Sequence, residues 1–283
     1  MTDFLSQLLL FWRPGLTGAL LALLLPLLGL YLRLRQEYWA ALAYGQVGAA
    51  GALGAMALGL PHIAGGLALG LAVAGAKHRL EKRLPPAGLF PLLFILGWSL
   101  SLLLTANLPG VERLGAALFE GQLYFAGVEM LCGAALALIV GTLFLWRTGR
   151  LLLLASLCPV HCHAQRLPVW RVGMGFDLLA AASLALAVMS LGVMGAFALV
   201  FIPPWLAFAL APGWRAALAV APVLAFFAYV VAFVLALIHD QPFGPTLVLV
   251  LGVLALPGAL AMRFAGHAES GKAHHFHPDD GKA

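Results

Sequence analysis

Residues 15–35 read GLTGALLALLLPLLGLYLRLR, an apolar run that no charge interrupts before Arg33 and Arg35 close it. The run has the length that an α-helix needs to cross about 30 Å of hydrocarbon. The strands of a membrane barrel would instead alternate apolar and polar residues with a period of two. Because every backbone amide inside a bilayer must bond internally, this stretch predicts a membrane-spanning helix.

The rest of the chain repeats this pattern. Hydrophobic residues make up 63% of the sequence and charged residues 10%, against about 45–50% and about 25% in soluble domains. We therefore predict an all-α polytopic membrane protein. The expected spans are 15–34, 38–60, 62–77, 87–106, 126–147, 172–192, 194–211, 215–238 and 244–263. The third is short and Pro203 and Pro204 interrupt the seventh, so eight spans remain the alternative to nine.

The positions of the basic residues indicate the orientation. With the N-terminus outside, every Lys and Arg except Arg13 and Arg113 falls in a loop on the inner side. Such a bias follows the positive-inside rule, so we expect nine spans, the N-terminus out and the C-terminus in. We interpret the net charge of +5 as a topology signal and not as a sign of nucleic-acid binding. The expected location is the bacterial inner (plasma) membrane.

The stretches outside the spans are short. We divide the chain into an interfacial segment at 1–14, a transmembrane domain at 15–263 and a flexible His-rich cytoplasmic tail at 264–283. Within the transmembrane domain, residues 148–171 form the main cytoplasmic segment. The sequence has no P-loop, nucleophile elbow or metalloprotease helix motif, and its three cysteines suggest no disulfide framework. We therefore do not expect an enzyme.

Five stretches, in order along the chain, resemble the permease subunit of metal-type (zinc and manganese) ABC importers. They are Phe11-Trp-Arg-Pro14 with the span ending in Leu32-Arg-Leu-Arg35, then Leu118-Phe-Glu-Gly121, Trp146-Arg147 through Leu157 to Gln165-Arg-Leu-Pro-Val169, Leu191-Gly-Val193 through Pro203, and Asp240-Gln-Pro-Phe-Gly-Pro-Thr246. Together they cover nearly the whole chain.

The resemblance implies a transport complex. Two permease subunits, a homodimer of this chain, would form the pathway. A cytoplasmic ABC ATPase subunit would hydrolyse ATP, and an extracytoplasmic solute-binding protein would deliver the substrate. This chain would bind no cofactor of its own. The resemblance also implies a short cytoplasmic coupling helix that contacts the ATPase, with Ser156, Cys158, His161, Cys162, Ala164, Arg166 and Pro168 as the coupling residues.

The second span departs from the family pattern. The family carries an Asp and then a His in this span, ahead of a Leu-Pro-Gly. Here Ala40 and Tyr44 take those places, and Gly48 stands where the Pro would be. This departure motivates an alternative substrate, such as a metal chelate.

Polar residues at membrane depth are functional candidates by default. Tyr44 and Gln46 could line the pathway, with packing as the alternative. His62, His239 and Asp240 lie at the predicted outer side, where imidazole and carboxylate suit a zinc-like cation. Their alternative is an ordinary interfacial role. We interpret Glu129 and Asp177 as charges in the first turns of helices, where a carboxylate complements the helix dipole.

Two groups of residues could bind a metal ion. If residues 158–165 are helical, Cys158, His161 and Cys162 share one face, and His163 is next to them. Thiolates and imidazole suit zinc or copper(I), although docking to the ATPase alone also explains this stretch. The tail contains His274, His275 and His277, and short His-rich tracts bind zinc or nickel when they converge. A merely solvated tail is the alternative.

From these observations we expect a permease subunit of an ABC importer for divalent metals, with zinc as the first candidate and manganese as the second. One alternative is a permease of the same fold for a metal chelate or another small solute. The other is a membrane scaffold subunit that transports nothing.

Overall fold

The computed structural model describes residues 11–83, 85–121 and 127–257. Within these ranges the regular elements are all helices, which confirms the predicted all-α class. Only the end of the 1–14 segment is described, and the His-rich tail lies outside the described residues. The helices are α2 (Trp12–Leu34), α3 (Tyr38–Ala57), α4 (His62–Glu81), α5 (Pro86–Asn107), α6 (Glu112–Glu120), α7 (Val128–Leu157), α8 (Pro159–Ala164), α9 (Val169–Leu210) and α10 (Trp214–His239), followed by a short apolar helix, Phe243–Pro257.

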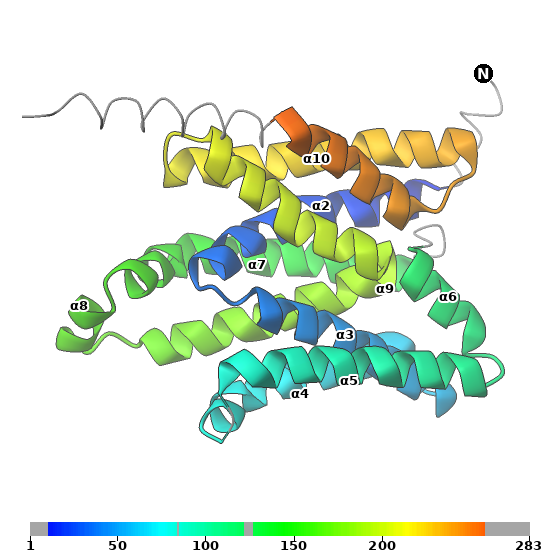
Figure 1. The fold of residues 1–283 in the computed structure, drawn as a ribbon, viewed down its shortest axis with the longest axis horizontal. Coiled ribbons are helices and arrows are strands. Elements are labelled where there is room, and N and C mark those ends of the chain that lie inside the picture. Colours follow the sequence, from blue (N-terminus) through cyan, green and yellow to red (C-terminus); the bar gives the residue numbers. More distant parts are fainter. Residues whose placement is uncertain (1–10, 84, 122–126, 258–283) are drawn as a thin grey trace, which may run out of the picture.

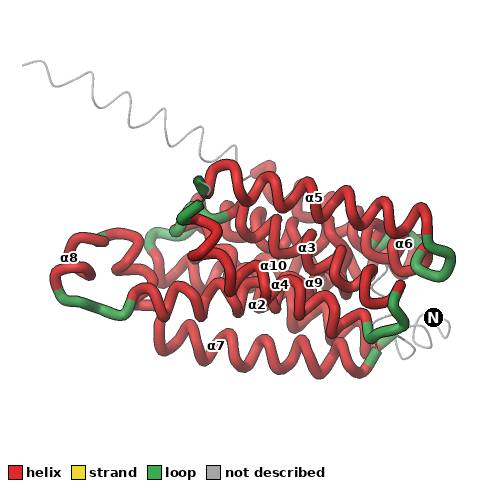
Figure 2. The backbone as a smooth tube through the Cα atoms, turned by 90° about the horizontal axis from the view of Figure 1, so that it is seen from below, coloured by secondary structure: helices red, strands yellow, loops and turns green. Residues whose placement is uncertain are grey.

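The long helices lie side by side in one bundle, with α8 at one end and α6 at the opposite end (Figures 1 and 2). We call these the α8 end and the α6 end. Within the described ranges, six helices are long and apolar enough to cross a membrane: α2, α3, α5 from Ala87, α7, α9 and α10. The protein is therefore a multi-pass membrane protein.

The predicted sixth and seventh spans are the two halves of α9. The halves meet at Gly192, whose φ of 77° and ψ of 167° are not helical. Figure 1 shows the chain turning back at this point, next to α6. Pro203 and Pro204 do not interrupt the second half, which continues through both to Leu210. The break therefore lies at the predicted boundary between the sixth and seventh spans, at a residue that tolerates positive φ. The interruption expected at the two prolines was wrong.

The prolines are tolerated because a neighbouring helix approaches closely. Pro204 cannot donate to the carbonyl of Val200, four residues earlier. The backbone of α2 passes this site at Gly29, where an added Cβ would meet the Val200 carbonyl oxygen and would lie 2.7 Å from Cγ of Pro204. Irregular backbone at membrane depth is tolerated where protein covers it.

Three glycines from distant parts of the chain meet at the α6 end. An added Cβ on Gly192 would meet the backbone of Gly121, and one on Gly121 would lie 2.8 Å from Cα of Gly244. Gly121 has a φ of 74° and forms the left-handed cap of α6. We call these three residues the glycine junction. They belong to three of the five stretches that carry the family resemblance, so these stretches are joined in space.

The helices differ in how deeply they are buried. The central helices α2, α3 and α9 bury most of their residues, including Leu24, Tyr44 and Phe176. By contrast, α5 and α7 expose large apolar side chains such as Leu103 and Leu136. This distribution suits a bundle whose outer helices face lipid or partner subunits.

Small residues bring α3 and α4 together. Gly51 and Gly65 face each other so closely that a Cβ on Gly65 would meet the Gly51 carbonyl oxygen. Glycine at such positions lets two backbones approach in lipid. Gly54 is different, because a Cβ there would find nothing within 4 Å. Gly54 therefore takes no part in the close approach of the two helices.

Candidate functional site: a ring of four charges beside the α7–α9 segment

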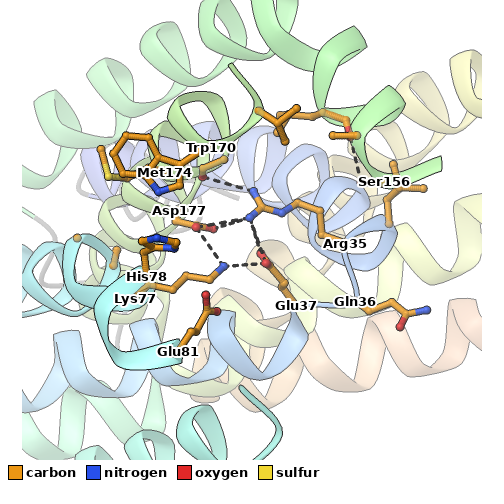
Figure 3. Close-up of a pocket in the computed structure, with 17 residues that line it drawn as sticks. Arg35, Gln36, Glu37, Lys77, His78, Glu81, Ser156, Trp170, Met174 and Asp177 are labelled. Carbon is orange, nitrogen blue, oxygen red and sulfur yellow. Dashed lines mark hydrogen bonds and ion pairs between the residues drawn. The ribbon is translucent and has the colours of Figure 1, made fainter. Parts of the chain in front are cut away.

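Four charged side chains form a closed ring at the α8 end of the bundle (Figure 3). Nη2 of Arg35 lies 3.0 Å from Oε2 of Glu37 and 3.2 Å from Oδ1 of Asp177. Nζ of Lys77 lies 2.7 Å from Oε1 of Glu37 and 3.0 Å from Oδ2 of Asp177. Each cation therefore contacts both carboxylates, and the formal charges of the ring sum to zero.

The turn between α2 and α3 positions two members of this ring. Gln36 adopts a left-handed conformation with a φ of 56°. The Glu37 amide donates to the Leu32 carbonyl at 2.9 Å and the Gln36 amide to that of Arg33 at 3.0 Å. These two hydrogen bonds define a Schellman motif. The motif brings Arg35 and Glu37 to the same side of the turn, where both face α4 and α9.

The ring joins segments that are far apart in sequence. Lys77 comes from α4 and Asp177 from α9, and both side chains are less than a tenth exposed. Arg35 also donates to the Gly173 carbonyl at 3.5 Å and lies 4.9 Å from the ring centroid of Phe176. Loss of one partner would leave a buried charge without compensation, which is costly. The ring therefore locks three parts of the bundle together at the α8 end.

A cavity of about 600 Å³ adjoins the ring. All four charged residues line it, and so do Ser156 near the end of α7 and Trp170 at the start of α9. The rings of Trp170 and His78, which both line the cavity, contact each other edge to face with centroids 5.9 Å apart. The charges therefore line the same cavity as the segment that connects α7 to α9. A displacement of that segment would therefore change the shape of the cavity next to the ring.

The connecting segment is shorter than expected. Helix α7 runs to Leu157 and α9 begins at Val169, so only residues 158–168 of the predicted cytoplasmic segment 148–171 lie outside the long helices. These residues contain the short helix α8 and a turn at Arg166, whose φ is 50°. The Leu167 amide closes the turn on the Cys162 carbonyl at 3.1 Å. The short helix that the family resemblance implied is thus present.

The predicted coupling residues differ in exposure. Cys158, His161, Ala164, Arg166 and Pro168 are exposed, Ser156 is partly buried, and Cys162 is buried at 3%. The Ser156 hydroxyl donates to the Leu152 carbonyl at 3.0 Å. Cys162, Arg166 and Trp170 line a second cavity of about 530 Å³. This part of the molecule offers an exposed surface of mixed character, with Val160 exposed beside His161 and Arg166, next to a hollow.

The structure gives little geometric support to a Cys-His metal site. Cys158 is the C-terminal cap of α7 with non-helical φ and ψ, so it does not share the face of α8 that was predicted for it. In the described part of the chain, no group of three or more His, Cys, Asp or Glu side chains could hold a metal ion. The side chain of His163 and the residues His274, His275 and His277 lie outside what the structure describes.

The five pathway candidates fall into two groups. Tyr44 and Gln46 are fully buried in α3, and the Tyr44 hydroxyl and both polar atoms of the Gln46 amide have no hydrogen-bond partner among the residues that the structure describes. His62 begins α4, partly exposed, while His239 and Asp240 are exposed where α10 ends. Asp240 adopts a left-handed conformation with a φ of 49° and caps α10. The candidates therefore form no common site in this conformation.

The ring was missed at the sequence level. We predicted Asp177 to lie in the first turn of a helix, but α9 begins eight residues earlier at Val169 and Asp177 is buried. The other three members looked like topology signals or loop residues. The available signal was a carboxylate inside an apolar run, with two basic residues next to other spans. The interpretation of Glu129 holds, since it lies in the first turn of α7.

The comparisons with known proteins agree with this architecture. A family model described as the ABC 3 transport family matches residues 8–263, nearly the whole chain. The chain belongs to the ABC 3 transport family. Members of this family are the transmembrane component of ABC transporters and not the ATPase. A search of curated proteins finds no match.

Two solved structures share the fold of this family member. One is PsaBC from Streptococcus pneumoniae in complex with Fab, with a TM-score of 0.78, 16% identity, and coverage of 91% of this chain and 94% of that chain. The other is described as an inward-facing conformation of a metal-chelate type ABC transporter, with a TM-score of 0.72, 16% identity, and coverage of 94% and 90%. At 16% identity, the similarity to these two structures shows a shared fold alone.

Proposed function

We propose that this chain is the membrane-spanning permease subunit of an ABC importer for divalent metal ions, with zinc first and manganese second. The family match over residues 8–263 is the observation that carries the proposal. The similarity in fold to PsaBC, and the short exposed helix between α7 and α9, support it. The chain would work as a homodimer with a cytoplasmic ATPase and an extracytoplasmic solute-binding protein.

We further propose nine membrane crossings, with the N-terminus outside and the C-terminus inside. In this topology the α8 end is cytoplasmic and the α6 end faces outward. The halves of α9 and the helix Phe243–Pro257 each provide a crossing, and α4 provides another. Arg35, Lys77 and Arg166 would then all lie at the inner side, as the positive-inside rule requires.

The ring of four charges gives this proposal a mechanism. The ATPase would dock on α8 and the turn at Arg166. Since Ser156 and Trp170 share the 600 Å³ cavity with the ring, movement of the docking segment would change the space around Lys77 and Asp177. ATP-driven closure of the ATPase pair would then loosen or restore the ring. In this proposal the ring holds the α2–α3 turn, α4 and α9 together at the inner end of each subunit.

The outer side would supply the first contacts with the substrate. His62, His239 and Asp240 carry the oxygen and nitrogen ligands that a zinc-like cation accepts, and they are accessible at the predicted outer side. Deeper in the bundle, Tyr44 and Gln46 have unpartnered polar atoms that could line a pathway once helices move.

A second candidate substrate is a metal chelate. Ala40 is buried and has no ligand atom, and Tyr44 replaces an imidazole with a phenol. A pathway without those ligands suits a metal that arrives already coordinated. The similarity in fold to a metal-chelate type transporter supports this alternative.

Uptake by the reconstituted complex tests both substrates. The chain, its ATPase and its binding protein would be placed in proteoliposomes, and uptake of radioactive zinc would be followed with the ion free or held by a small chelator. ATP-dependent uptake of free zinc supports the proposal, and uptake of chelated zinc alone supports the alternative. If the chain neither associates with an ATPase nor moves either form, the scaffold interpretation replaces both.

Two variants would locate the entry contacts. His239→Gln removes an imidazole, and Asp240→Asn removes a charge while keeping a residue that tolerates left-handed backbone. We expect each to raise the KM for zinc severalfold and to leave kcat unchanged, since both residues are exposed at the end of α10. An unchanged KM in both would remove these residues from the pathway.

A further inference from the structure

A third hollow, of about 560 Å³, lies on the side of the bundle where α2 ends and α3 begins. Most of its wall is apolar and comes from α3 and the second half of α9: Leu42, Phe201, Ile202 and Trp205. Arg33 and Tyr38 also line it. It is distinct from the cavity at the ring, which none of these six residues lines.

The two polar side chains of this hollow have unpartnered atoms. Nη1 of Arg33 and the hydroxyl of Tyr38 are both buried, and neither has a hydrogen-bond partner among the described residues. The Arg33 guanidinium lies 4.8 Å from the ring centroid of Phe208, which covers one of its faces. A buried donor without a partner costs free energy. Both atoms are closed to water in this conformation, so an occupant accepts their two hydrogen bonds once the Arg33 and Tyr38 side chains turn towards the hollow.

A purely structural role explains Arg33 only in part. As the basic residue in the last turn of α2, it complements the helix dipole, and its contact with Phe208 is a cation–π interaction. Neither interaction requires an unpaired Nη1 or an unpaired Tyr38 hydroxyl at the edge of an apolar hollow. The two donors and the apolar wall together describe a site for a molecule with an anionic head and a hydrocarbon tail.

We propose that this hollow binds the phosphate and the first part of an acyl chain of an anionic phospholipid. Arg33 and Tyr38 donate hydrogen bonds to the phosphate oxygens, which are strong acceptors for a guanidinium. The acyl chain lies along Leu42, Phe201 and Ile202. Trp39 is half-exposed at the entrance, and Trp205 lines the wall, as aromatic residues do at headgroup level. Basic pockets between membrane helices are known sites for such headgroups.

Lipid binding to the purified full-length chain tests the proposal. Native mass spectrometry in detergent would measure binding of phosphatidylglycerol, with phosphatidylcholine as the uncharged comparison. We compare the wild type, Arg33→Gln, Tyr38→Phe and a matched control, Arg215→Gln, which removes an exposed arginine at the start of α10. Far-UV circular dichroism confirms that each variant is folded, so that loss of binding is not loss of structure.

We expect phosphatidylglycerol to bind the wild type and the control alike, and at least tenfold more tightly than phosphatidylcholine. Arg33→Gln should weaken phosphatidylglycerol binding about tenfold, the effect of one hydrogen bond to a charged group. Tyr38→Phe should weaken it less, because a neutral donor is lost. Equal binding to the wild type and folded Arg33→Gln would overturn the proposal, as would equal affinity for both lipids. If Arg33→Gln instead turns a dimer into a monomer without changing lipid binding, the hollow is an interface between copies of the chain.

Discussion

The two ends of the bundle are held together in opposite ways. At the α8 end, four side chains from α2, α3, α4 and α9 meet through ion pairs of 2.7–3.2 Å, next to a cavity of about 600 Å³. At the α6 end, Gly121, Gly192 and Gly244 meet through backbone atoms, and a Cβ on two of them would lie within 3 Å of another backbone. The α8 end therefore depends on long side chains that line a cavity, and the α6 end depends on close contact between backbones.

This difference indicates which end can move at low cost. Ion pairs between long side chains can lengthen, hydrate or change partners when helices shift by an ångström or two, especially next to a cavity. A close-packed backbone junction cannot do so without losing its contacts, because interiors are packed near their density limit. We therefore expect the α6 end of each subunit to move as a unit and the α8 end to rearrange within the subunit during transport.

Adding a side chain at the glycine junction should have the largest effect. Gly192→Ala places a Cβ against the Gly121 backbone at a residue with positive φ. The backbone at Gly192 is in a positive-φ, extended region that is essentially limited to glycine. A side chain in that region and overpacking each cost about 1–3 kcal/mol, so we expect a loss of about 3 kcal/mol, measured as a lower Tm in detergent. Gly54→Ala is the control, since nothing lies within 4 Å of its added Cβ. If both variants have the same Tm, the junction is not close-packed.

Neutralising one member of the ring should have the next largest effect. Asp177→Asn leaves Arg35 and Lys77 with a single carboxylate and should cost about 2–3 kcal/mol, at the low end for a buried pair because water can enter the cavity. The double variant Asp177→Asn with Lys77→Gln should recover part of this loss, as a double-mutant cycle on Tm would measure. Glu81→Gln is the control, because Glu81 lines the same cavity and is in none of the ion pairs of the described residues. Strict additivity in the cycle would contradict the ring.

A reversed charge at the turn after α8 should separate docking from folding. Arg166 is exposed, so Arg166→Glu should leave the Tm unchanged. We expect it to weaken association with the ATPase subunit about tenfold, which corresponds to about 1.4 kcal/mol. Co-purification and ATPase stimulation provide the readout. Undiminished association would mean that the ATPase docks elsewhere and that the α8 end is not the coupling end.

The smallest expected effect is a gain in stability at the turn between α2 and α3, which positions Arg35 and Glu37 in the ring. Gln36 is exposed and adopts left-handed backbone at the C-terminal cap of α2, a position that favours glycine. Gln36→Gly should stabilise the protein by about 0.5–1 kcal/mol, and Leu34→Gly, inside the helix, should destabilise it by a similar amount. A lower Tm for Gln36→Gly would show that the Gln36 side chain contributes to the ring end.

The sequence predicted most of the helices because bilayer thickness and backbone hydrogen bonding leave few choices for a long apolar run. The ends and internal contacts of the spans were harder to predict from the sequence. The break in α9 lies at the predicted boundary between two spans, but the contact of Gly192 with Gly121, about seventy residues earlier, is tertiary and no local pattern shows it. The prolines wrongly suggested an interruption in the second half of α9. Likewise, α7 continues ten residues past its predicted end, since hydropathy does not show where a helix stops in water.

The candidate site was harder to predict than the fold. Arg35 and Glu37 are neighbours in sequence, but their pairing with Lys77 and Asp177 depends on how three helices pack. The family resemblance correctly indicated a short helix between α7 and α9. It did not indicate the ring, and local spacing made Cys158 look like part of α8, when it is the cap of the preceding helix.

Cellular metal content tests the central claim, that the chain imports a divalent metal, most directly. A strain lacking this chain would be grown under zinc, manganese and iron limitation, and cell-associated metal would be measured. The account predicts a selective zinc deficit that the wild-type chain restores and Arg166→Glu does not. Normal content of all three metals, in a strain with no redundant importer, would contradict the metal assignment and leave the family and the fold.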